Sequence, residues 1–380
     1  MKLSFYQEFY QKSIDEKKKK NIYRSLSKFT PISSTKIKKD DNELISFCSN
    51  DYFALAQNDE VKKAAIDAIN KFGVGASSSR FISGNNHLYE ELEESLARFK
   101  NCDDAIVFSS GYNCAISIIP ALVGKGDLVI ADRLIHSCLI DGIKLSQAKL
   151  FRFAHNDLNH CCNLLKENRN QYKKCLIISE SIFSMDGDIA DIDALLELSK
   201  KFNSLLLIDY AHDLGLNKID DKNCDFLKMG TLSKAFGSFG GYIAGDSILI
   251  DYLRNFAKSV IYSTALPPAI LQAAITSMQI IKQDNLGQKA LNNASYFCQL
   301  LDLNNPQSAI VPIIIGDSLE TLKIAQNIAK EGFLVSAIRP PTVENGKSRL
   351  RITFSAMHNK EQIKQLSKII MSNLLTSKCR

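Results

Sequence analysis

The fold of this chain is most clearly indicated by residues 175–209, whose sequence is CLIISESIFSMDGDIADIDALLELSKKFNSLLLID. The stretch begins with an apolar run at Cys175–Ser179 and ends with another at Leu205–Asp209. Apolar runs without polar alternation are typical of parallel strands buried on both faces of a sheet. Between them, the apolar residues of Asp191–Phe202 recur with helical spacing. The stretch therefore predicts a strand, a helix and a second parallel strand, which is the repeating unit of an α/β fold.

Similar patterns extend this unit in both directions along the chain. Further strands are expected at Ala105–Phe108, at Leu128–Ala131 and near Phe226–Met229, mostly with helical segments between them. Two helices are expected before the sheet. One covers 59–72, where Asn58 can cap its start and Gly73 can end it, and the other covers 86–99.

Beyond about residue 285 the order of elements changes. A helix is followed by a strand at Ile310–Ile315, a helix at Leu319–Lys330, a strand at Leu350–Phe354 and a last helix. We therefore expect an α/β protein with a mainly parallel central sheet flanked by helices, and a smaller C-terminal α+β domain. The expected divisions are a basic N-terminal arm at 1–45, a large α/β domain at 46–285 and a small domain at 286–380.

Composition excludes several classes of protein. The 380 residues are 45% hydrophobic, with 47 Lys and Arg against 41 Asp and Glu, which is enough apolar material for a large buried core. We find no apolar run of about 18 residues and no secretory signal, so we expect a cytoplasmic protein outside the membrane. The ten cysteines form no C-x-x-C pair and the six histidines form no H-E-x-x-H motif, so we expect no metal site.

The positive charge is concentrated near the N-terminus. Residues 1–40 hold 11 Lys and Arg against 4 Asp and Glu. Nucleic-acid binders more often spread such charge over a folded face, so no nucleic acid is expected. The pattern favours an amphipathic helix in which Lys17 to Lys20 face water. The alternative is a docking arm for an acidic partner or a phosphate-bearing substrate.

Three polar features follow predicted strands, where parallel-sheet proteins place ligands. Ser109-Ser110-Gly111-Tyr112 begins a helix, whose free amides suit a phosphate, although many such turns contain glycine. Asp209 ends a buried strand, where it either caps the next segment or pairs with a positive ligand. Lys234 lies in GTLSKAFG among small residues, and burial would lower the pKa of its amine and make it a usable Schiff-base nucleophile.

Together the three features describe one cofactor. A phosphate-binding turn, an acid for a pyridine nitrogen and a lysine for an aldehyde are what pyridoxal 5′-phosphate requires. Asp209 would keep the ring nitrogen protonated, so that the ring can accept the electrons of a substrate carbanion.

From Phe47 to the last helix the chain resembles the α-oxoamine synthases, a fold-type I family of pyridoxal-phosphate enzymes. The motifs that carry this resemblance are SNDY (49–52), FSSGY (108–112), HND (155–157), ESIFSMDG (180–187), GTLSKAFG (230–237), IYSTALPP (261–268), AIRPPTV (337–343) and SRLRITFSAMH (348–358). The resemblance implies the fold-type I transferase architecture and a homodimer with shared active sites.

The resemblance also implies roles for matching residues. Lys234 would bind the cofactor covalently, Asp209 would pair with its ring nitrogen and His136 would stack on the ring. Further cofactor contacts are expected from Gly111, Tyr112, Ser184, His212, Thr231, Ser263 and Thr264, of which the last two would reach the phosphate of the neighbouring subunit. Substrate contacts are expected from Arg24, Asn50, Thr342 and Arg351.

Some of these positions have simpler interpretations. Arg349 and Arg351 alternate with apolar residues and could both point off one face of a strand, so the choice of Arg351 for the substrate carboxylate rests on the resemblance. Arg24 lies in the basic arm, where an incidental arginine is equally compatible with the pattern. His155 is interpreted as structural.

The implied reaction is a decarboxylative condensation of an amino acid with an acyl thioester. The AIRPPTV run favours family members that use L-alanine and a pimeloyl thioester, carried by an acyl carrier protein or by coenzyme A. The alternatives are glycine-using members, 5-aminolevulinate synthase and 2-amino-3-ketobutyrate ligase, or a cofactor-binding protein without catalysis. Side-by-side turnover with alanine and glycine separates the alanine-using reaction from the glycine-using ones.

Two stretches depart from the family pattern. Ser77 and Ser78 stand where relatives often have Gly-Gly, and the glycine-rich stretch usual after Asp213-Leu214-Gly215-Leu216 is missing. The second change shortens the interval before Lys234 and implies an altered entrance for the acyl substrate.

Overall fold

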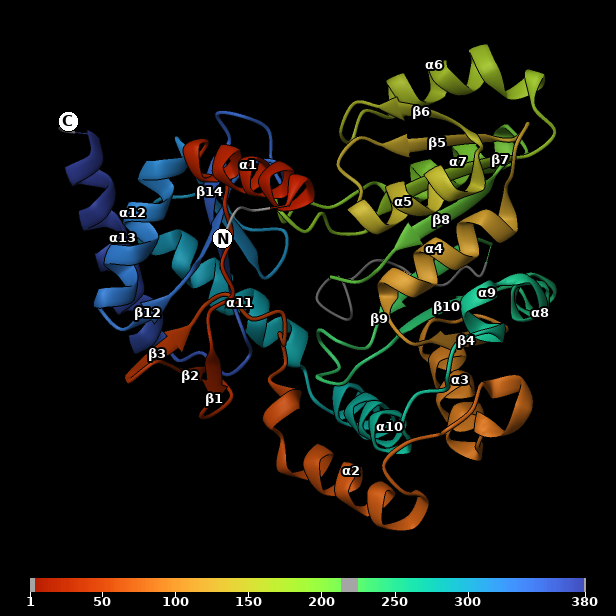
Figure 1. The fold of residues 1–380 in the computed structure, drawn as a ribbon, viewed down its shortest axis with the longest axis horizontal. Helices are drawn as coiled ribbons and strands as arrows, with labels where there is room; N and C mark the ends of the chain where they lie inside the picture. The colour runs from red at the N-terminus through yellow and green to blue at the C-terminus, as the bar shows by residue number, and fades with distance from the viewer. Residues whose placement is uncertain (1–3, 213–224, 379–380) are drawn as a thin grey trace. The chain divides into compact units, whose positions relative to one another are not determined.

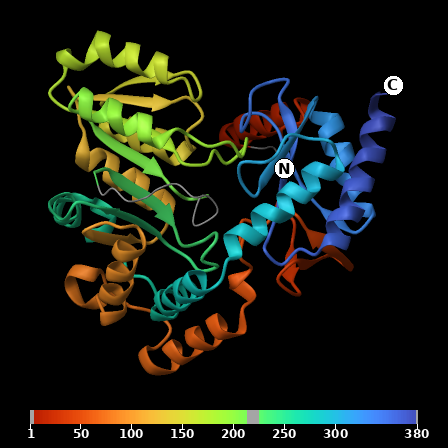
Figure 2. The same cartoon turned by 180° about the vertical axis from the view of Figure 1, so that it is seen from behind.

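The computed structural model describes residues 4–212 and 225–378, and the shortened stretch after Asp213 lies outside them. The chain forms two compact units, one of residues 50–289 and one that combines residues 1–49 with 290–380. Each is visible in Figure 1 and, from behind, in Figure 2. No helix among the described residues has the length and apolar character needed to cross a membrane.

The unit of residues 50–289 is built on a seven-stranded sheet. Its strand order is β4 (Asp104–Phe108), β10 (Gly241–Gly245), β9 (Leu227–Thr231), β8 (Leu205–Asp209), β7 (Cys175–Glu180), β5 (Leu128–Asp132) and β6 (Lys149–Phe153). Neighbours from β9 to β6 pair in parallel, and β10 runs antiparallel to both β4 and β9. The mainly parallel sheet expected from the sequence is confirmed.

Helices cover both faces of this sheet because alternate strand residues point to opposite sides. On β5, Val129 and Ala131 pack in the core under α4 (Gly111–Leu122), α5 (Ser137–Ser146) and α8 (Ser247–Phe256). Leu128 and Ile130 point the other way, into the core under α6 (Leu158–Asn168) and α7 (Ile192–Lys201). All residues of β5 and β7 are buried, which explains their unbroken apolar sequences.

The remaining helices of this unit are α2 (Asp59–Phe72), α3 (His87–Phe99), α9 (Lys258–Ile261) and α10 (Pro268–Gln283), with short helical turns at Leu55–Gln57, Arg80–Gly84 and Arg169–Gln171. Helix α2 has the predicted bounds. The Asn58 side chain accepts hydrogen bonds from the N–H groups of Glu60 and Val61, and Gly73 ends the helix at φ +84°. Ser77, one of the two serines that depart from the family pattern, has φ +56°, a conformation that glycine adopts at less cost.

The second unit contains two small sheets. One has the order β1 (Phe29–Pro31), β2 (Lys36–Lys39), β3 (Asn42–Ser46) and β12 (Phe333–Leu334), and the other has β11 (Ile310–Gly316), β14 (Ser348–Thr353) and β13 (Ser336–Ile338). Its helices are α1 (Phe5–Lys19), most of α11 (Leu286–Leu300), α12 (Ser318–Lys330) and α13 (Lys360–Lys378). The mixed α and β order expected beyond residue 285 is therefore present.

The N-terminal region differs from the separate arm that the sequence suggested. Strand β3 pairs in parallel with β12, with Ile45 opposite Phe333, so residues 1–45 are tied to the C-terminal region. Phe47, which is fully buried, stacks on His358 with ring centroids 3.9 Å apart, and its carbonyl accepts a hydrogen bond from Thr353 N–H. This burial of an aromatic side chain explains why the first strands join a distant part of the sequence.

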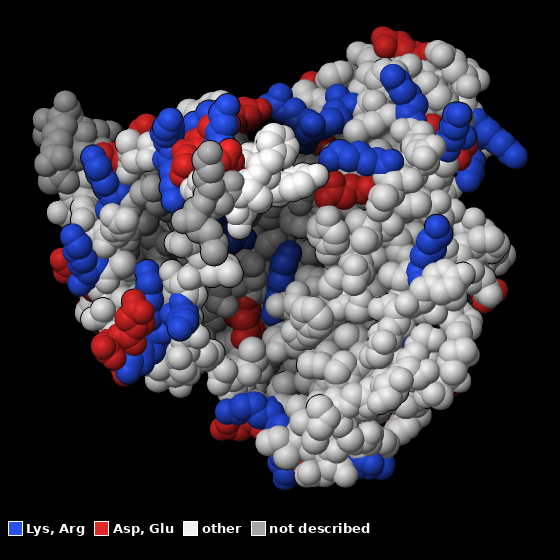
Figure 3. Space-filling model, viewed as in Figure 1, with Lys and Arg blue, Asp and Glu red and all other residues white. Residues whose placement is uncertain are grey.

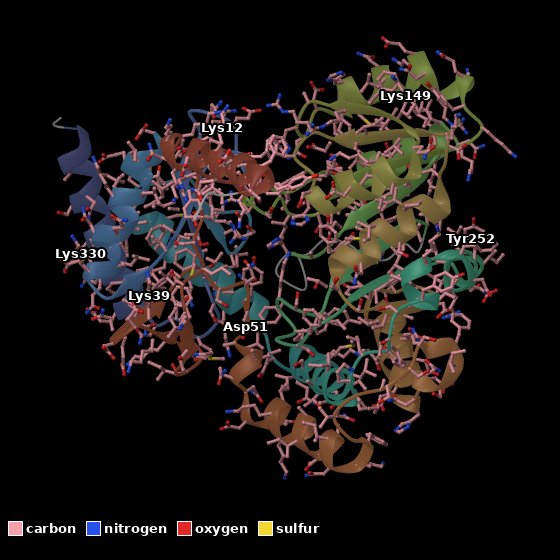
Figure 4. The ribbon with its side chains drawn as sticks, in the orientation of Figure 1. Lys12, Lys39, Asp51, Lys149, Tyr252 and Lys330 are labelled. Carbon is pink, nitrogen blue, oxygen red and sulfur yellow. The ribbon has the colours of Figure 1, made fainter. Side chains whose placement is uncertain are left out.

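Helix α1 is the amphipathic N-terminal helix that the sequence predicted. Ser4 and Gln7 form a capping box at its start, and no residue of the helix is buried. Lys17 to Lys20 are exposed to solvent at and just after its last turn. Figure 3 shows charged side chains of both signs at the surface there, and Lys12 projects from the helix in Figure 4.

Glycine at position 142 sets how closely α5 packs on α4. A Cβ there would lie 2.7 Å from the carbonyl oxygen of Ala115 and 3.0 Å from Ile119 Cδ1. We predict that Gly142→Ala lowers the free energy of unfolding by about 1–3 kcal/mol, because overpacking outweighs alanine's helix propensity. Urea unfolding measures this. Gly75→Ala is the control, since nothing lies within 4 Å of its Cβ position; equal stability of the two variants would contradict the prediction.

Candidate active site

A cavity of about 250 Å³ opens at the carboxyl ends of the parallel strands. Sheet register brings its polar groups together, because Glu180 at the end of β7 lies opposite Asp209 at the end of β8. The lining residues are Ser110, Gly111, Tyr112, His136, Cys138, Glu180, Asp209, Ala211, His212, Met229, Gly230, Thr231, Ser233 and Lys234. Seven residues that the sequence analysis selected for a cofactor therefore line one cavity.

The start of α4 forms one side of the cavity. Ser110 caps the helix by accepting a hydrogen bond from Asn113 N–H at 3.0 Å. The first turn of a helix presents unpaired amides at the positive end of its dipole, which suits a phosphate. Glycine is required beside this turn, since a Cβ on Gly241 would lie 2.5 Å from Ser110 O and 2.6 Å from Gly111 N.

Asp209 places a carboxylate inside the cavity wall. It is 5% exposed, and its Oδ1 accepts a hydrogen bond from Ala211 N–H at 2.9 Å. Burial raises the pKa of this carboxyl, and the nearby positive charge of Lys234 opposes the rise. A buried carboxylate is costly without a positive partner, and a protonated ring nitrogen would provide one.

Lys234 and His212 are in direct contact. The Lys234 Nζ lies 2.8 Å from His212 Nε2, and His212 is 6% exposed. The lysine follows β9 in a turn that Thr231 stabilises, because Thr231 Oγ1 donates a hydrogen bond to Gly240 O at 2.8 Å. The amine is therefore held at the cavity, beside a group that can exchange protons with it.

His136 caps α5, and this sets its tautomer. Its Nδ1 accepts a hydrogen bond from Cys138 N–H at 3.2 Å and lies 2.9 Å from Cys138 Sγ. In the neutral ring the proton is therefore on Nε2. Burial lowers the pKa of His136, which favours this neutral ring, while the negative charge of Asp209 opposes the shift.

Glu180 was not selected from the sequence. Its Oε1 accepts a hydrogen bond from His136 N–H at 2.5 Å and so fixes the residue expected to stack on the ring. Burial raises the pKa of Glu180 well above its ordinary value, and the charge of Asp209 adds to the rise. Its position at the end of β7, beside the predicted Asp209, is the signal by which the sequence could have identified it.

The structure places other predicted cofactor residues outside the cavity wall. Ser184 lies in the loop after β7, and its backbone N–H is hydrogen-bonded to Glu180. Ser263 and Thr264 lie between α9 and α10, where Thr264 forms a bridge with Ser79. Their expected roles stay predictions.

Three of the predicted substrate residues lie in the second unit. Arg24 Nη2 donates a hydrogen bond to Thr342 Oγ1 at 2.8 Å, which joins two predicted positions 318 residues apart. Arg351 is 4% exposed within β14, as is its neighbour Arg349, whose Nε donates to Lys347 O. The fourth residue, Asn50, begins the other unit.

His155 connects the ends of two strands to the loop that contains Ser184. Its Nδ1 lies 3.1 Å from Asp132 Oδ1, and its Nε2 lies 2.7 Å from Asp188 Oδ2. Although burial lowers the pKa of His155, the hydrogen bonds to these two carboxylates raise it to about 10. The imidazolium therefore holds Asp188, near the end of the ESIFSMDG loop, against the end of β5.

Known proteins of similar sequence and fold support this description. A family model for aminotransferases of class I and II matches residues 42–370. The 8-amino-7-oxononanoate synthase of Granulibacter bethesdensis is 41% identical over 357 residues, which cover 93% of this chain and 94% of that protein. The solved structure of 8-amino-7-oxononanoate synthase from Francisella tularensis matches with a TM-score of 0.75 and 28% identity, over 88% of this chain and 99% of that one. A serine palmitoyltransferase from S. paucimobilis has the same fold, with a TM-score of 0.90 and 24% identity over the whole of both chains.

We predict that His155→Gln lowers the free energy of unfolding by about 3 kcal/mol at neutral pH, because two carboxylates lose their shared cation. The folded-state pKa of about 10 exceeds the ordinary 6.5. The stabilisation by the imidazolium is therefore fully present below pH 6.5 and is lost as the pH rises through about 10. Denaturant unfolding of both proteins across this range measures the difference.

The control variant is His160→Gln, at an exposed position of α6, where the ring Nδ1 accepts a hydrogen bond from Ala154 N–H. It should cost about 1 kcal/mol or less. The assignment of His155 as a stabilising imidazolium would be contradicted if the free energies of unfolding of the original protein and His155→Gln differed little. It would also be contradicted if their difference did not narrow toward pH 10.

Proposed function

This chain belongs to the class I and II aminotransferase family, and from that premise we propose that it is a pyridoxal-phosphate-dependent acyltransferase. The proposed reaction joins L-alanine to a pimeloyl thioester with loss of carbon dioxide and release of the thiol, and it gives 8-amino-7-oxononanoate for biotin biosynthesis. The observation that carries the proposal is the single cavity that unites Asp209, His136 and the His212-bound Lys234. The relatives named for this activity support the choice of substrates.

The donor set of the cavity fits pyridoxal phosphate. The first turn of α4 would hold the phosphate, Asp209 the ring nitrogen and Lys234 the aldehyde carbon. His136, whose Nδ1 accepts a hydrogen bond from Cys138 N–H, would cover one face of the pyridine. When bound, the cofactor supplies an electron sink for a carbanion at the substrate Cα.

The chain's own residues then divide the remaining work. Lys234 Nζ would be the base that removes the Cα proton of the amino acid and the acid that later returns one. His212 Nε2, at 2.8 Å, orients that amine. Asp209 keeps the ring nitrogen protonated, and its burial strengthens this pairing because water does not screen it.

Substrate and partner roles are also part of the proposal. Arg351 would bind the alanine carboxylate, with Arg24, Thr342 and Asn50 as further substrate contacts. Ser263 and Thr264 would reach the phosphate of a second subunit, which makes the working form a homodimer. We place the enzyme in the cytoplasm, where pimeloyl thioesters of a carrier protein or of coenzyme A are available.

We predict that the loaded enzyme releases thiol from pimeloyl-coenzyme A or pimeloyl-carrier protein with L-alanine at least about tenfold faster than with glycine. Lys234→Ala should reduce this rate by about 10³-fold or more, because the covalent link and the base are both lost. The matched control is Lys125→Ala, an exposed lysine outside the cavity. A colorimetric assay of free thiol measures all combinations.

Each alternative gives a distinct outcome in that assay. Faster turnover with glycine would favour a glycine-using synthase. Cofactor binding without thiol release from either amino acid would favour a non-catalytic protein. Near-normal turnover by Lys234→Ala would contradict the proposed role of this lysine.

We further predict that reversing the charge of Lys17 to Lys20 raises the KM for pimeloyl-carrier protein several-fold and leaves the KM for alanine unchanged. The four exposed lysines would attract an acidic carrier, and removal of such a charge acts mainly on association. Steady-state kinetics at low and high salt tests this. The same substitutions assayed with pimeloyl-coenzyme A are the control, and unchanged KM values for both acyl donors would show that the lysines only face water.

A further inference from the structure

A buried tyrosine extends the contact between Lys234 and His212. The hydroxyl of Tyr52 lies 2.6 Å from His212 Nδ1, and Tyr52 is 1% exposed. On the opposite side of the imidazole, Nε2 lies 2.8 Å from Lys234 Nζ. The three side chains therefore form a continuous hydrogen-bonded line from a buried phenol to the cavity amine.

The loop that carries Tyr52 is held rigidly. The carboxylate of the preceding residue, Asp51, accepts hydrogen bonds from Leu55 N–H at 2.9 Å and Ala56 N–H at 3.0 Å. Burial raises the pKa of Asp51 to about 6, and these backbone donors oppose the rise. Asp51 is labelled in Figure 4, just before α2.

Glycine in the lysine turn brings this loop close. Gly237, three residues after Lys234, has φ +60°, and a Cβ on it would lie 2.3 Å from Ala56 N. The GTLSKAFG turn therefore packs directly on the backbone that follows Tyr52. Backbone contacts therefore hold both the loop that carries Tyr52 and the turn that carries Lys234.

The chemistry of imidazole explains why a tyrosine suits this position. A neutral imidazole donates from one nitrogen and accepts at the other. When Lys234 is an ammonium, Nε2 accepts from it and Nδ1–H donates to the Tyr52 oxygen. When Lys234 is a neutral amine, Nε2–H donates to Nζ and Nδ1 accepts from the Tyr52 hydroxyl. A phenol can satisfy both states, whereas phenylalanine satisfies neither.

We propose that Tyr52 is a positioning residue that acts through His212 and tunes the protonation of Lys234. It matches each protonation state of the amine with one tautomer of His212, so that no buried nitrogen loses its partner. The Tyr52 hydroxyl also faces Asn50 Oδ1, but at 3.4 Å against 2.6 Å to His212 Nδ1, so the closer imidazole nitrogen is the better acceptor for its proton. A phenol donates a hydrogen bond more strongly than it accepts one, so Tyr52 favours the neutral, nucleophilic amine. This inference rests on the proposed role of Lys234 and adds Tyr52 to the residues that control it.

The test compares how the full chain, freed of cofactor, reacts with added pyridoxal phosphate at different pH values. The rate at which the visible absorption band forms gives the pH midpoint of the reacting amine. Tyr52→Phe should raise this midpoint by about 0.5–1 pH unit, a change of about three- to tenfold in proton affinity. Incorporation of 3-fluorotyrosine at position 52 makes the phenol a stronger donor and should lower the midpoint.

Tyr89→Phe is the matched control. Tyr89 is 2% exposed and its hydroxyl accepts a hydrogen bond from Leu266 N–H at 2.6 Å, so the variant loses an equally buried phenol whose partner is a backbone amide and not His212. Its midpoint should equal that of the original protein. An unchanged midpoint in both Tyr52 variants would overturn the inference. Absence of any absorption band in the original protein would instead refute the proposed function.

A second measurement needs no substitution at Tyr52. Nitrogen-15 NMR of the original full chain, with the His212 signals assigned by their loss in His212→Asn, reports which ring nitrogen carries the proton. The proton should move from Nδ1 to Nε2 as the pH rises through the midpoint of the amine. A tautomer that stays the same on both sides of that midpoint would also overturn the inference.

Discussion

The interaction on which the site depends is the burial of the Asp209 carboxylate at the end of β8. The strand is enclosed by helices on both faces, so this charge has almost no access to water. Such a group is tolerated only where positive partners face it. The positive charge of Lys234 meets that requirement in part, and a protonated ring nitrogen would complete it. The cost of burying one acid thus favours a cationic heterocycle as the ligand of this cavity.

The sheet arranges these groups through a single antiparallel strand. Gly241 in β10 lies opposite Phe108 of β4 on one side and Thr231 of β9 on the other. That position brings the first turn of α4, which follows β4, next to the lysine turn, which follows β9. Only glycine fits there, because any side chain would strike the backbone of Ser110 and Gly111. The first turn of α4 and the lysine turn are therefore neighbours through backbone packing.

The parts of the structure that depend on local pattern could be predicted from the sequence, and the parts that depend on distant contacts could not. The unit at 175–209 and helix α2 follow from apolar periodicity and capping. Strand β10 was missed because GYIAG has few of the β-branched and aromatic residues typical of strands. The pairing of β3 with β12 was missed because it joins residues about 290 positions apart. Asp209 and Lys234 could be selected from their surroundings in the sequence, and His136 from the resemblance. Glu180 and Tyr52 lie in the ESIFSMDG and SNDY motifs, but their roles depend on partners that only the folded chain brings near.

The central claim is that the Lys234 amine is the one that binds an aldehyde cofactor beside Asp209. The most direct measurement is to incubate the full chain with pyridoxal phosphate, reduce it with borohydride and locate the modified residue by peptide mass spectrometry. We predict one stoichiometric adduct on Lys234, within the tryptic peptide Met229–Arg254 that results when cleavage at the modified lysine is blocked. Stoichiometric modification of another lysine, or no specific modification, would contradict it.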